Sequence, residues 1–327
     1  MRIQKLQVQI ACAVAAFMLL AACGNDAGEA AANGEPMTKL SVGVFAGSSA
    51  LPLYVAHTQG IFNKHNIDST LVPGQGAPAL LASVLGGSTQ VALGVPSSTF
   101  AAIDQEGGVG VLPPYQNLDF ELLAMDSAAK GDITKLAGKT IGVTALGGAT
   151  DVWLRGLLTE AGMDPAKDVT IIASGGLPAT DAALQQGSID AAVITGPLTP
   201  VLMQGGLKLV TVVSALEGKR TGVNDWGIEI MWVASEKYFE SHPKLSGQYC
   251  AALADTIKWM ADPANGAAGA TIVEKELAVP AATAPAVWET ARKLWTMEMD
   301  EDRWNKNLEY FDIASSKTEM KTASLGC

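Results

Sequence analysis

The chain has 327 residues, of which 48% are hydrophobic and 17% charged, and its formal net charge is −11. This length fits two domains of ordinary size, and the apolar content excludes a wholly disordered chain. With 22 Lys and Arg against 33 Asp and Glu, no basic stretch could follow a phosphate backbone, so we expect no nucleic-acid partner. Three histidines and the lack of a CxxC pair predict no metal site and no cofactor.

The N-terminus is typical of a targeting segment followed by a tether. Two basic residues precede an apolar stretch from about Ile10 to Leu20, which is too short to predict a membrane-spanning helix. Leu20-Ala21-Ala22-Cys23 resembles the bacterial lipobox. We therefore expect residues 1–22 to be a signal peptide and Cys23 to be the lipidated first residue; an ordinary signal peptide with an incidental cysteine is the alternative. Residues 23–36 are small and acidic, which predicts a flexible tether.

The first half of the body alternates strand-like and helix-like segments. Such alternation predicts a parallel sheet covered by helices, and hence an α/β fold. The expected elements are a strand at Leu40–Phe45, a helix at Ser49–Thr58, a strand at Ile67–Val72, a helix around Ala77–Leu85 and a strand at Val91–Val95.

The second half repeats this order. The expected elements are strands at Thr140–Thr144, Val169–Ala173 and Ala191–Ile194 and helices at Thr150–Ala161 and Pro178–Gln186. Residues recur as well, because Gly76, Pro78 and Ala79 reappear one hundred positions later as Gly176, Pro178 and Ala179. The repeat indicates two related Rossmann-like lobes rather than chance agreement between helices rich in alanine and glycine.

Two such lobes predict a ligand site between them, because ligands of open parallel sheets lie beyond the carboxyl ends of the strands. The loops at those ends carry glycines, hydroxyls and an amide, and each precedes a predicted helix. Helix N-termini offer unpaired N–H groups to a polar or anionic ligand; for any single loop, ordinary helix capping is the alternative. The candidate ligand-binding residues are Ser48, Ser49, Gln75, Gly76, Ser97, Ser98, Thr144, Gly148, Thr150, Thr195 and Trp226.

Several candidates have a structural alternative. Trp226 either stacks on a ligand or packs within the protein. Asp151 either binds an amino group or forms a helix pair with Arg155. Cys250 and Cys327 either form a disulfide in an oxidising compartment or stay as free thiols, and the sequence leaves both open.

The sequence resembles the substrate-binding proteins of ABC importers for nitrate, sulfonates and taurine, a family that includes binders of thiamine precursors. The motifs that carry the resemblance, over about residues 40–235, are Val42-Gly43-Val44, Leu53-Tyr54-Val55-Ala56, Leu136–Val143 and Ala161–Pro165. It implies a type II periplasmic-binding-protein fold with a two-strand hinge, placed at about Leu122–Asp126 and Asn224–Met231. Lobe 1 is then 37–124 plus 228–327, with C-terminal helices, and lobe 2 is 125–227.

The resemblance also implies a function. We expect an extracytoplasmic, monomeric lipoprotein, anchored to the membrane through Cys23, that captures a small sulfonate-like, taurine-like or nitrate-like solute and delivers it to ABC permease subunits. A thiamine-precursor-type heterocycle is the alternative ligand, and a ligand sensor without transport the alternative role. The chain departs from the family at Thr195-Gly196-Pro197, where members often carry Trp-Asp/Glu-Pro, and its first lobe has no arginine before the hinge. No nucleophile elbow, HExxH or Walker loop is present, so we expect no enzyme.

Overall fold

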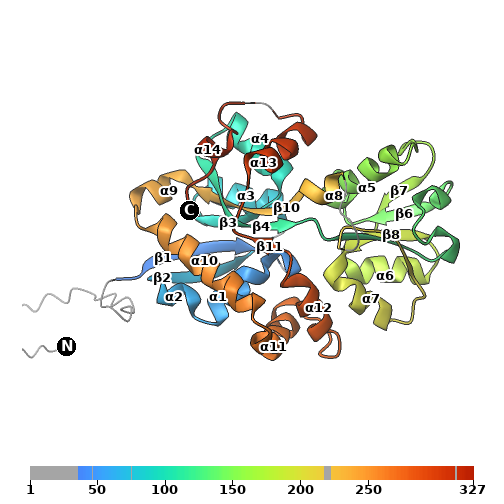
Figure 1. The fold of residues 1–327 in the computed structure, drawn as a ribbon, viewed down its shortest axis with the longest axis horizontal. Coiled ribbons are helices and arrows are strands. Elements are labelled where there is room, and N and C mark those ends of the chain that lie inside the picture. The colour runs from blue at the N-terminus through green and yellow to red at the C-terminus, as the bar shows by residue number, and fades with distance from the viewer. Residues whose placement is uncertain (1–35, 46, 75, 217–221, 314) are drawn as a thin grey trace, which may run out of the picture.

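The computed structural model describes residues 36–327 apart from 46, 75, 217–221 and 314. Two lobes lie side by side along the long axis of the molecule, and each is built around one β-sheet with helices packed against it (Figure 1). This is the two-lobed α/β architecture that the strand–helix alternation predicts. The expected signal peptide, the lipidated Cys23 and nearly all of the tether lie outside the described residues.

The first lobe contains a six-stranded sheet in the order β11-β4-β10-β3-β1-β2. Its first three strands in the chain pair in parallel, whereas β10 runs antiparallel to β3 and β4. β3 is buried along its whole length, as expected for a short apolar strand between two helical layers. The strands are β1 (Thr38–Val44), β2 (Ile67–Pro73), β3 (Val91–Gly94), β4 (Val109–Asn117), β10 (Ile228–Ser235) and β11 (Trp295–Thr296).

Ten α-helices accompany this sheet in the described part of the chain. They share one apolar core with the strands, in which the side chains of Phe62, Trp232 and Trp288 are fully buried. The helices are α1 (Leu51–Thr58), α2 (Ile61–Lys64), α3 (Ala77–Leu85), α4 (Pro96–Gln105), α9 (Glu236–Ser241), α10 (Leu245–Ala261), α11 (Gly266–Leu277), α12 (Ala284–Ala291), α13 (Glu301–Tyr310) and α14 (Met320–Ala323).

The second lobe contains a five-stranded sheet in the order β7-β6-β8-β5-β9. β6, β7 and β8 pair in parallel, and β5 runs antiparallel to β8 and β9. Its elements are β5 (Phe120–Ala124), β6 (Thr140–Val143), α5 (Ala149–Glu160), β7 (Thr170–Ala173), α6 (Leu177–Gln185), β8 (Ala191–Thr195), α7 (Thr199–Gln204), β9 (Val210–Ser214) and α8 (Val223–Trp226).

The internal repeat is present in the structure. α3 and α6 span the same positions at an offset of one hundred residues. The strand pairings match too, because Val42 pairs with Val91 in the first sheet and Ile141 pairs with Ala191 in the second. The following residue is a glycine in both strands, and a Cβ at either would lie within 3 Å of a neighbouring side chain. The two half-molecules therefore share register and close packing as well as element order.

The chain crosses between the lobes twice. The first crossing lies at Leu118 and Asp119, between β4 of the first sheet and β5 of the second. The second lies at Gly227, between α8 and β10. The expected crossing at Leu122–Asp126 and the boundary after residue 124 are therefore wrong, because 120–124 pairs with β8 and β9 in the second lobe. A largely apolar strand fits either sheet, so the composition of 120–124 does not show which lobe this segment belongs to.

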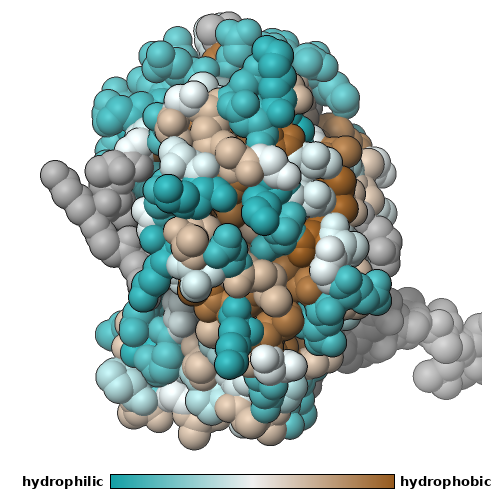
Figure 2. All heavy atoms as spheres, turned by 90° about the vertical axis from the view of Figure 1, so that its right-hand side faces the viewer, coloured by the Kyte–Doolittle hydropathy of each residue, from teal (hydrophilic) through white to brown (hydrophobic). Residues whose placement is uncertain are grey.

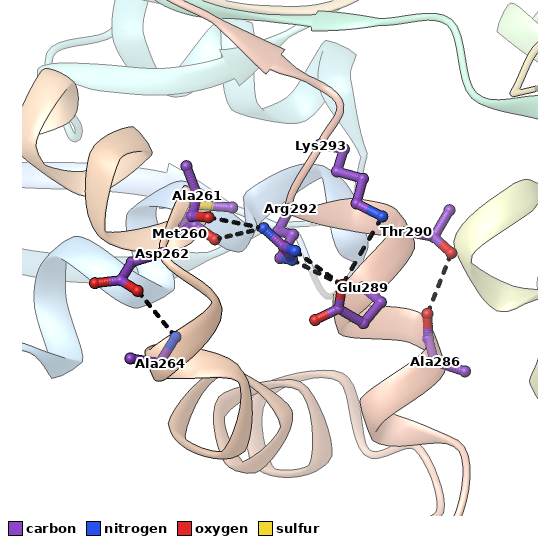
Figure 3. A network of polar contacts seen from close by, with 9 residues as sticks. All are labelled: Met260, Ala261, Asp262, Ala264, Ala286, Glu289, Thr290, Arg292 and Lys293. Carbon is purple, nitrogen blue, oxygen red and sulfur yellow. Dashed lines mark hydrogen bonds and ion pairs between the residues drawn. The ribbon is translucent and has the colours of Figure 1, made fainter.

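The C-terminal helices return to the first lobe and are tied to one another. Arg292, just beyond α12, donates from Nη1 to the carbonyls of Met260 and Ala261 at the end of α10, at 3.3 and 3.0 Å (Figure 3). Its Nε and Nη2 donate to the carboxylate of Glu289. Cys250 of α10 forms a disulfide with Cys327, with the Cα atoms 5.6 Å apart. Of the two alternatives that the sequence left open for these cysteines, the structure has the disulfide.

Candidate functional site

A cavity of about 630 Å³ lies between the two lobes. Its walls come from the loops after the parallel strands of both sheets, from both crossings, and from the C-terminal end of α13. The carboxyl ends of the two sets of parallel strands therefore meet at one cavity, as the repeat predicts. A volume of this size holds a small organic molecule.

Helix N-termini from both lobes reach the cavity wall, among them two of each lobe that begin directly after the loops of the parallel strands. The lining includes Gly76 before α3, Val95 before α4, Gly148 before α5 and Gly176 before α6. In none of these four described helices does the N-cap side chain accept a hydrogen bond from the first turn. The N–H groups of their first turns, apart from Pro78, Pro96 and Pro178, which have none, and the positive ends of their dipoles can therefore bind acceptor groups of a solute.

All ten described residues predicted for the site line the cavity, and Gln75 lies outside the described residues. The hydroxyl groups among them differ in whether they have a hydrogen-bond partner within the protein. Thr150 is bound internally, because its Oγ1 pairs with Oγ1 of Thr144 at 2.6 Å and accepts from the Thr144 N–H at 3.1 Å. Ser48 Oγ is buried and has no hydrogen-bond partner in the described structure. The residues that line the cavity as predicted are Ser48, Ser49, Gly76, Ser97, Ser98, Thr144, Gly148, Thr150, Thr195 and Trp226.

Aromatic side chains form a large part of the lining. Trp226 packs edge-to-face on Tyr310, with the ring centroids 5.5 Å apart, and Phe120 packs in the same way on Trp153 at 5.6 Å. The Trp226 ring thus packs within the protein and also borders the cavity. Sequence analysis missed Tyr310 and its neighbours on α13, because a helix so far along the chain carries no loop signal. The aromatic lining residues are Phe45, Phe120, Trp153, Trp226, Tyr310 and Phe311.

A buried cluster of two carboxyl groups and an amide lies at the crossings and was also missed. Glu229 of β10 lines the cavity, while Asp119 of the first crossing lies behind the wall and is fully buried. The Gln116 side-chain amide joins them, because its Nε2 donates to Asp119 Oδ2 at 3.0 Å and to Glu229 Oε2 at 2.9 Å. Burial raises the pKa of Asp119 to about 6. Burial also raises the pKa of Glu229 well above its usual value, and the charge of Asp119 raises it further.

No lysine or arginine is found among the described residues that line the cavity. Three arginines that the structure describes bind protein groups instead. Arg155 pairs with Asp151 at 2.8 Å, so the helix-pair alternative for Asp151 is the one observed. Arg303 joins the two crossings, donating to the carbonyls of Trp226 and Gly227 and to the side chain of Asn117. The third is Arg292, which binds the end of α10.

The described residues give little sign of metal or nucleophile chemistry. They hold no group of three or more His, Cys, Asp and Glu side chains that could bind a metal ion. His57 pairs with Ser69 and His65 with Asp255, and neither histidine borders the cavity. Among the helices of this part of the chain, none is long and apolar enough to cross a membrane.

Comparison with known proteins finds a family and a fold. The model of a family described as NMT1-like matches residues 33–274. The periplasmic aliphatic sulphonate-binding protein SsuA from Escherichia coli is similar, with a TM-score of 0.71 and 15% identity over 88% of this chain and 91% of that one. The periplasmic nitrate-binding protein NrtA from Synechocystis PCC 6803 has a TM-score of 0.66 and 16% identity over 88% and 85%. A search of curated proteins finds no match.

The same architecture also occurs in a catalyst. The desulfurization enzyme DSZB has a TM-score of 0.64 to this chain and 15% identity over 88% of this chain and 96% of that one. At such identities the likeness shows the periplasmic-binding-protein fold alone. The function therefore has to be inferred from the residues and geometry of the site itself.

Proposed function

The chain belongs to the NMT1-like family, and on that premise we propose that it is the extracytoplasmic solute-binding protein of an ABC importer. The observation that carries the proposal is the cavity between the lobes, lined by helix N-termini from both and crossed at its base by two chain segments. Such a cavity suits a solute captured by rotation of one lobe against the other. Binding then favours the closed arrangement to the extent that the solute binds it more tightly.

The solute is small and polar. Sequence reasoning favours a sulfonate-like, taurine-like or nitrate-like ligand, which the uncapped helix N-termini of the cavity wall could bind. The heterocycle alternative has its own support, because six aromatic side chains and no lysine or arginine are among the described lining residues. Aromatic walls of this kind bind ring systems by stacking and apolar contact.

The anchor, the partners and the oligomeric state complete the proposal. Leu20-Ala21-Ala22-Cys23 supports lipidation at Cys23 and hence a monomer tethered at the outer face of the membrane, next to its permease subunits. A sensor that binds the same solute without transport is the alternative role. Uptake of the labelled solute by cells with and without the gene separates the two, since a sensor's loss leaves initial uptake through the permease unchanged.

Small-angle scattering with and without solute tests the central claim. A thermal-shift screen first identifies a stabilising compound, because a ligand at a hundredfold excess over its Kd adds about 2.7 kcal/mol to stability. The radius of gyration should then fall on saturation with that compound. An unchanged radius at saturation would argue against lobe closure, and a screen of polar solutes without a single hit would argue against a solute-binding role.

A further inference from the structure

Glu229 is the only acidic or basic side chain among the described residues that line the cavity. It is the second residue of β10, immediately after the crossing at Gly227, and 6% of its surface is exposed. Its Oε1 accepts a hydrogen bond from Ser49 Oγ at 3.5 Å, and its Oε2 accepts one from Gln116. The carboxyl group therefore sits at the base of the cavity, held from both sides by first-lobe residues.

The partners of Glu229 supply no positive charge. Behind it lies Asp119, which has no exposed surface and whose Oδ1 has no hydrogen-bond partner in the described structure. Glu121, the next acid along the chain, adds repulsion to Asp119. Two buried carboxyl groups that share one amide repel each other when both are ionised, so the pair keeps a proton more readily than a free acid does.

A buried charge without a counterion is costly, and so is an unpaired buried hydroxyl. Ser48, 2% exposed, places such a hydroxyl in the same wall as Ser49. The base of the cavity thus offers carboxyl oxygens with no cation beside them in the described structure, together with an unpaired hydroxyl. A sulfonate placed against Glu229 would be repelled whenever that carboxyl group ionises, whereas a nitrogen with hydrogens to donate would supply a favourable partner.

We propose that Glu229 is the recognition carboxyl of this cavity, and that the solute presents to it a hydrogen-bond-donating nitrogen, an amine or an amidine, on an apolar or aromatic body. The inference rests on the proposed solute-binding function and names the class of solute. The body of such a solute would contact the rings of Phe120 and Trp226, and an aromatic face also attracts a cationic nitrogen. Acceptor groups elsewhere on the solute would face the helix N-termini.

The test uses four probes that share one benzyl or phenyl body: benzylamine, benzamidine, phenylmethanesulfonate and benzyl alcohol. Each is titrated calorimetrically into the wild-type protein, into Glu229→Gln and into the control Glu121→Gln. Glu121 is a matched control because it is also 6% exposed but does not line the cavity, its carboxylate being bound by Ser214 and Thr199. Thermal unfolding of each unliganded variant checks that it is folded.

We expect benzylamine and benzamidine to bind the wild type and Glu121→Gln equally well. Their affinity should fall about tenfold or more in Glu229→Gln, the loss typical of one charged hydrogen bond. The sulfonate should bind the wild type more weakly than either. If Glu229→Gln does not fold, Asp119→Asn takes its place without changing the cavity lining: it removes the charge that raises the pKa of Glu229, so the two nitrogen probes should bind more tightly there than to the wild type, whereas phenylmethanesulfonate should not.

Two outcomes would overturn the inference: tighter binding of the sulfonate than of the amines, or amine binding that Glu229→Gln leaves unchanged. In either case a probe that binds and contracts the molecule in scattering leaves the proposed function standing. If none of the four probes binds, the nitrogen preference is refuted, and the wider solute screen then decides the proposed function by itself.

Discussion

The carboxyl pair at the crossings should make the stability of the fold depend on pH in a direction opposite to the usual one for acids. Burial raises the pKa of Asp119 from 3.8 to about 6. Between these two values the folded chain binds more protons than the unfolded chain, so the free energy of unfolding falls as the pH rises and levels off above about 6. A shift of about 2 pH units corresponds to about 3 kcal/mol.

The substitution Asp119→Asn removes this term while keeping the size of the side chain. We expect urea unfolding between pH 4 and pH 7 to show that the wild type loses about 3 kcal/mol of stability relative to the variant over this interval. The exposed Asp68→Asn is the control and should follow the wild type in parallel. Parallel curves for Asp119→Asn and the wild type would show that Asp119 ionises normally, and the account of a proton-sharing pair would fail.

Three further predictions concern the crossings, the disulfide and the anchor. Gly227→Ala should lower stability by about 1–3 kcal/mol by overpacking, because its Cβ would lie 2.4 Å from Leu118 Cδ1 and 2.5 Å from the Val223 carbonyl oxygen. The control Gly247→Ala in α10, where the Cβ meets nothing within 4 Å, should not lower stability. Equal urea midpoints for the two variants would contradict the close packing of the crossings. Reduction of the Cys250–Cys327 disulfide, whose cysteines are 77 residues apart, should lower the free energy of unfolding by about 4 kcal/mol. The wild type should therefore melt at a lower temperature in dithiothreitol, and Cys327→Ser should melt at that lower temperature without reductant. A melting temperature that the reductant leaves unchanged would mean that the disulfide does not constrain the chain. Cys23→Ala should release the protein from the membrane fraction of cells, while a variant that stays in that fraction would refute lipidation at this residue.

Local signals in the sequence were enough to predict most of the fold. The pattern of apolar residues predicted α3 at Ala77–Leu85 with its observed bounds, because its buried side chains Leu80 and Val84 repeat at helical spacing. The cavity loops were predictable for a similar reason. Each combines glycine or a hydroxyl with the start of a helix, and parallel topology places the carboxyl ends of neighbouring strands together.

Contacts between distant parts of the chain were not predictable. Glu229 and Gln116 are 113 positions apart, and nothing around either residue in the sequence indicates a buried partner. The strand that begins at Phe120 is buried along its whole length and is apolar apart from Glu121, so its pattern fits the first lobe as well as the second. Tyr310 borders the cavity only because α13 packs between the lobes, where its hydroxyl donates to the Val152 carbonyl of α5 at 3.2 Å.

The same topology explains why the two carboxyl groups meet. In each sheet the antiparallel strand beside the third parallel strand enters directly from a crossing: β5 follows Asp119 and pairs with β8, while β10 follows Gly227 and pairs with β3. Asp119 and Glu229 therefore lie on the two segments about which the lobes would rotate. Because Gln116 binds both carboxyl groups at once, rotation at either crossing would alter the hydrogen bonds that join the two segments. A solute nitrogen at Glu229 would act on this cluster at the hinge itself, which would couple recognition of the solute to closure of the lobes more directly than a contact at the tip of either lobe. The second lobe carries three of the most exposed large apolar side chains in the described chain, Met125, Leu146 and Met203, and its outer end shows apolar residues among hydrophilic ones (Figure 2). Of these, Leu146 adjoins Gly147 in the cavity wall, so a rotation of the second lobe that narrows the cavity would carry this residue with it.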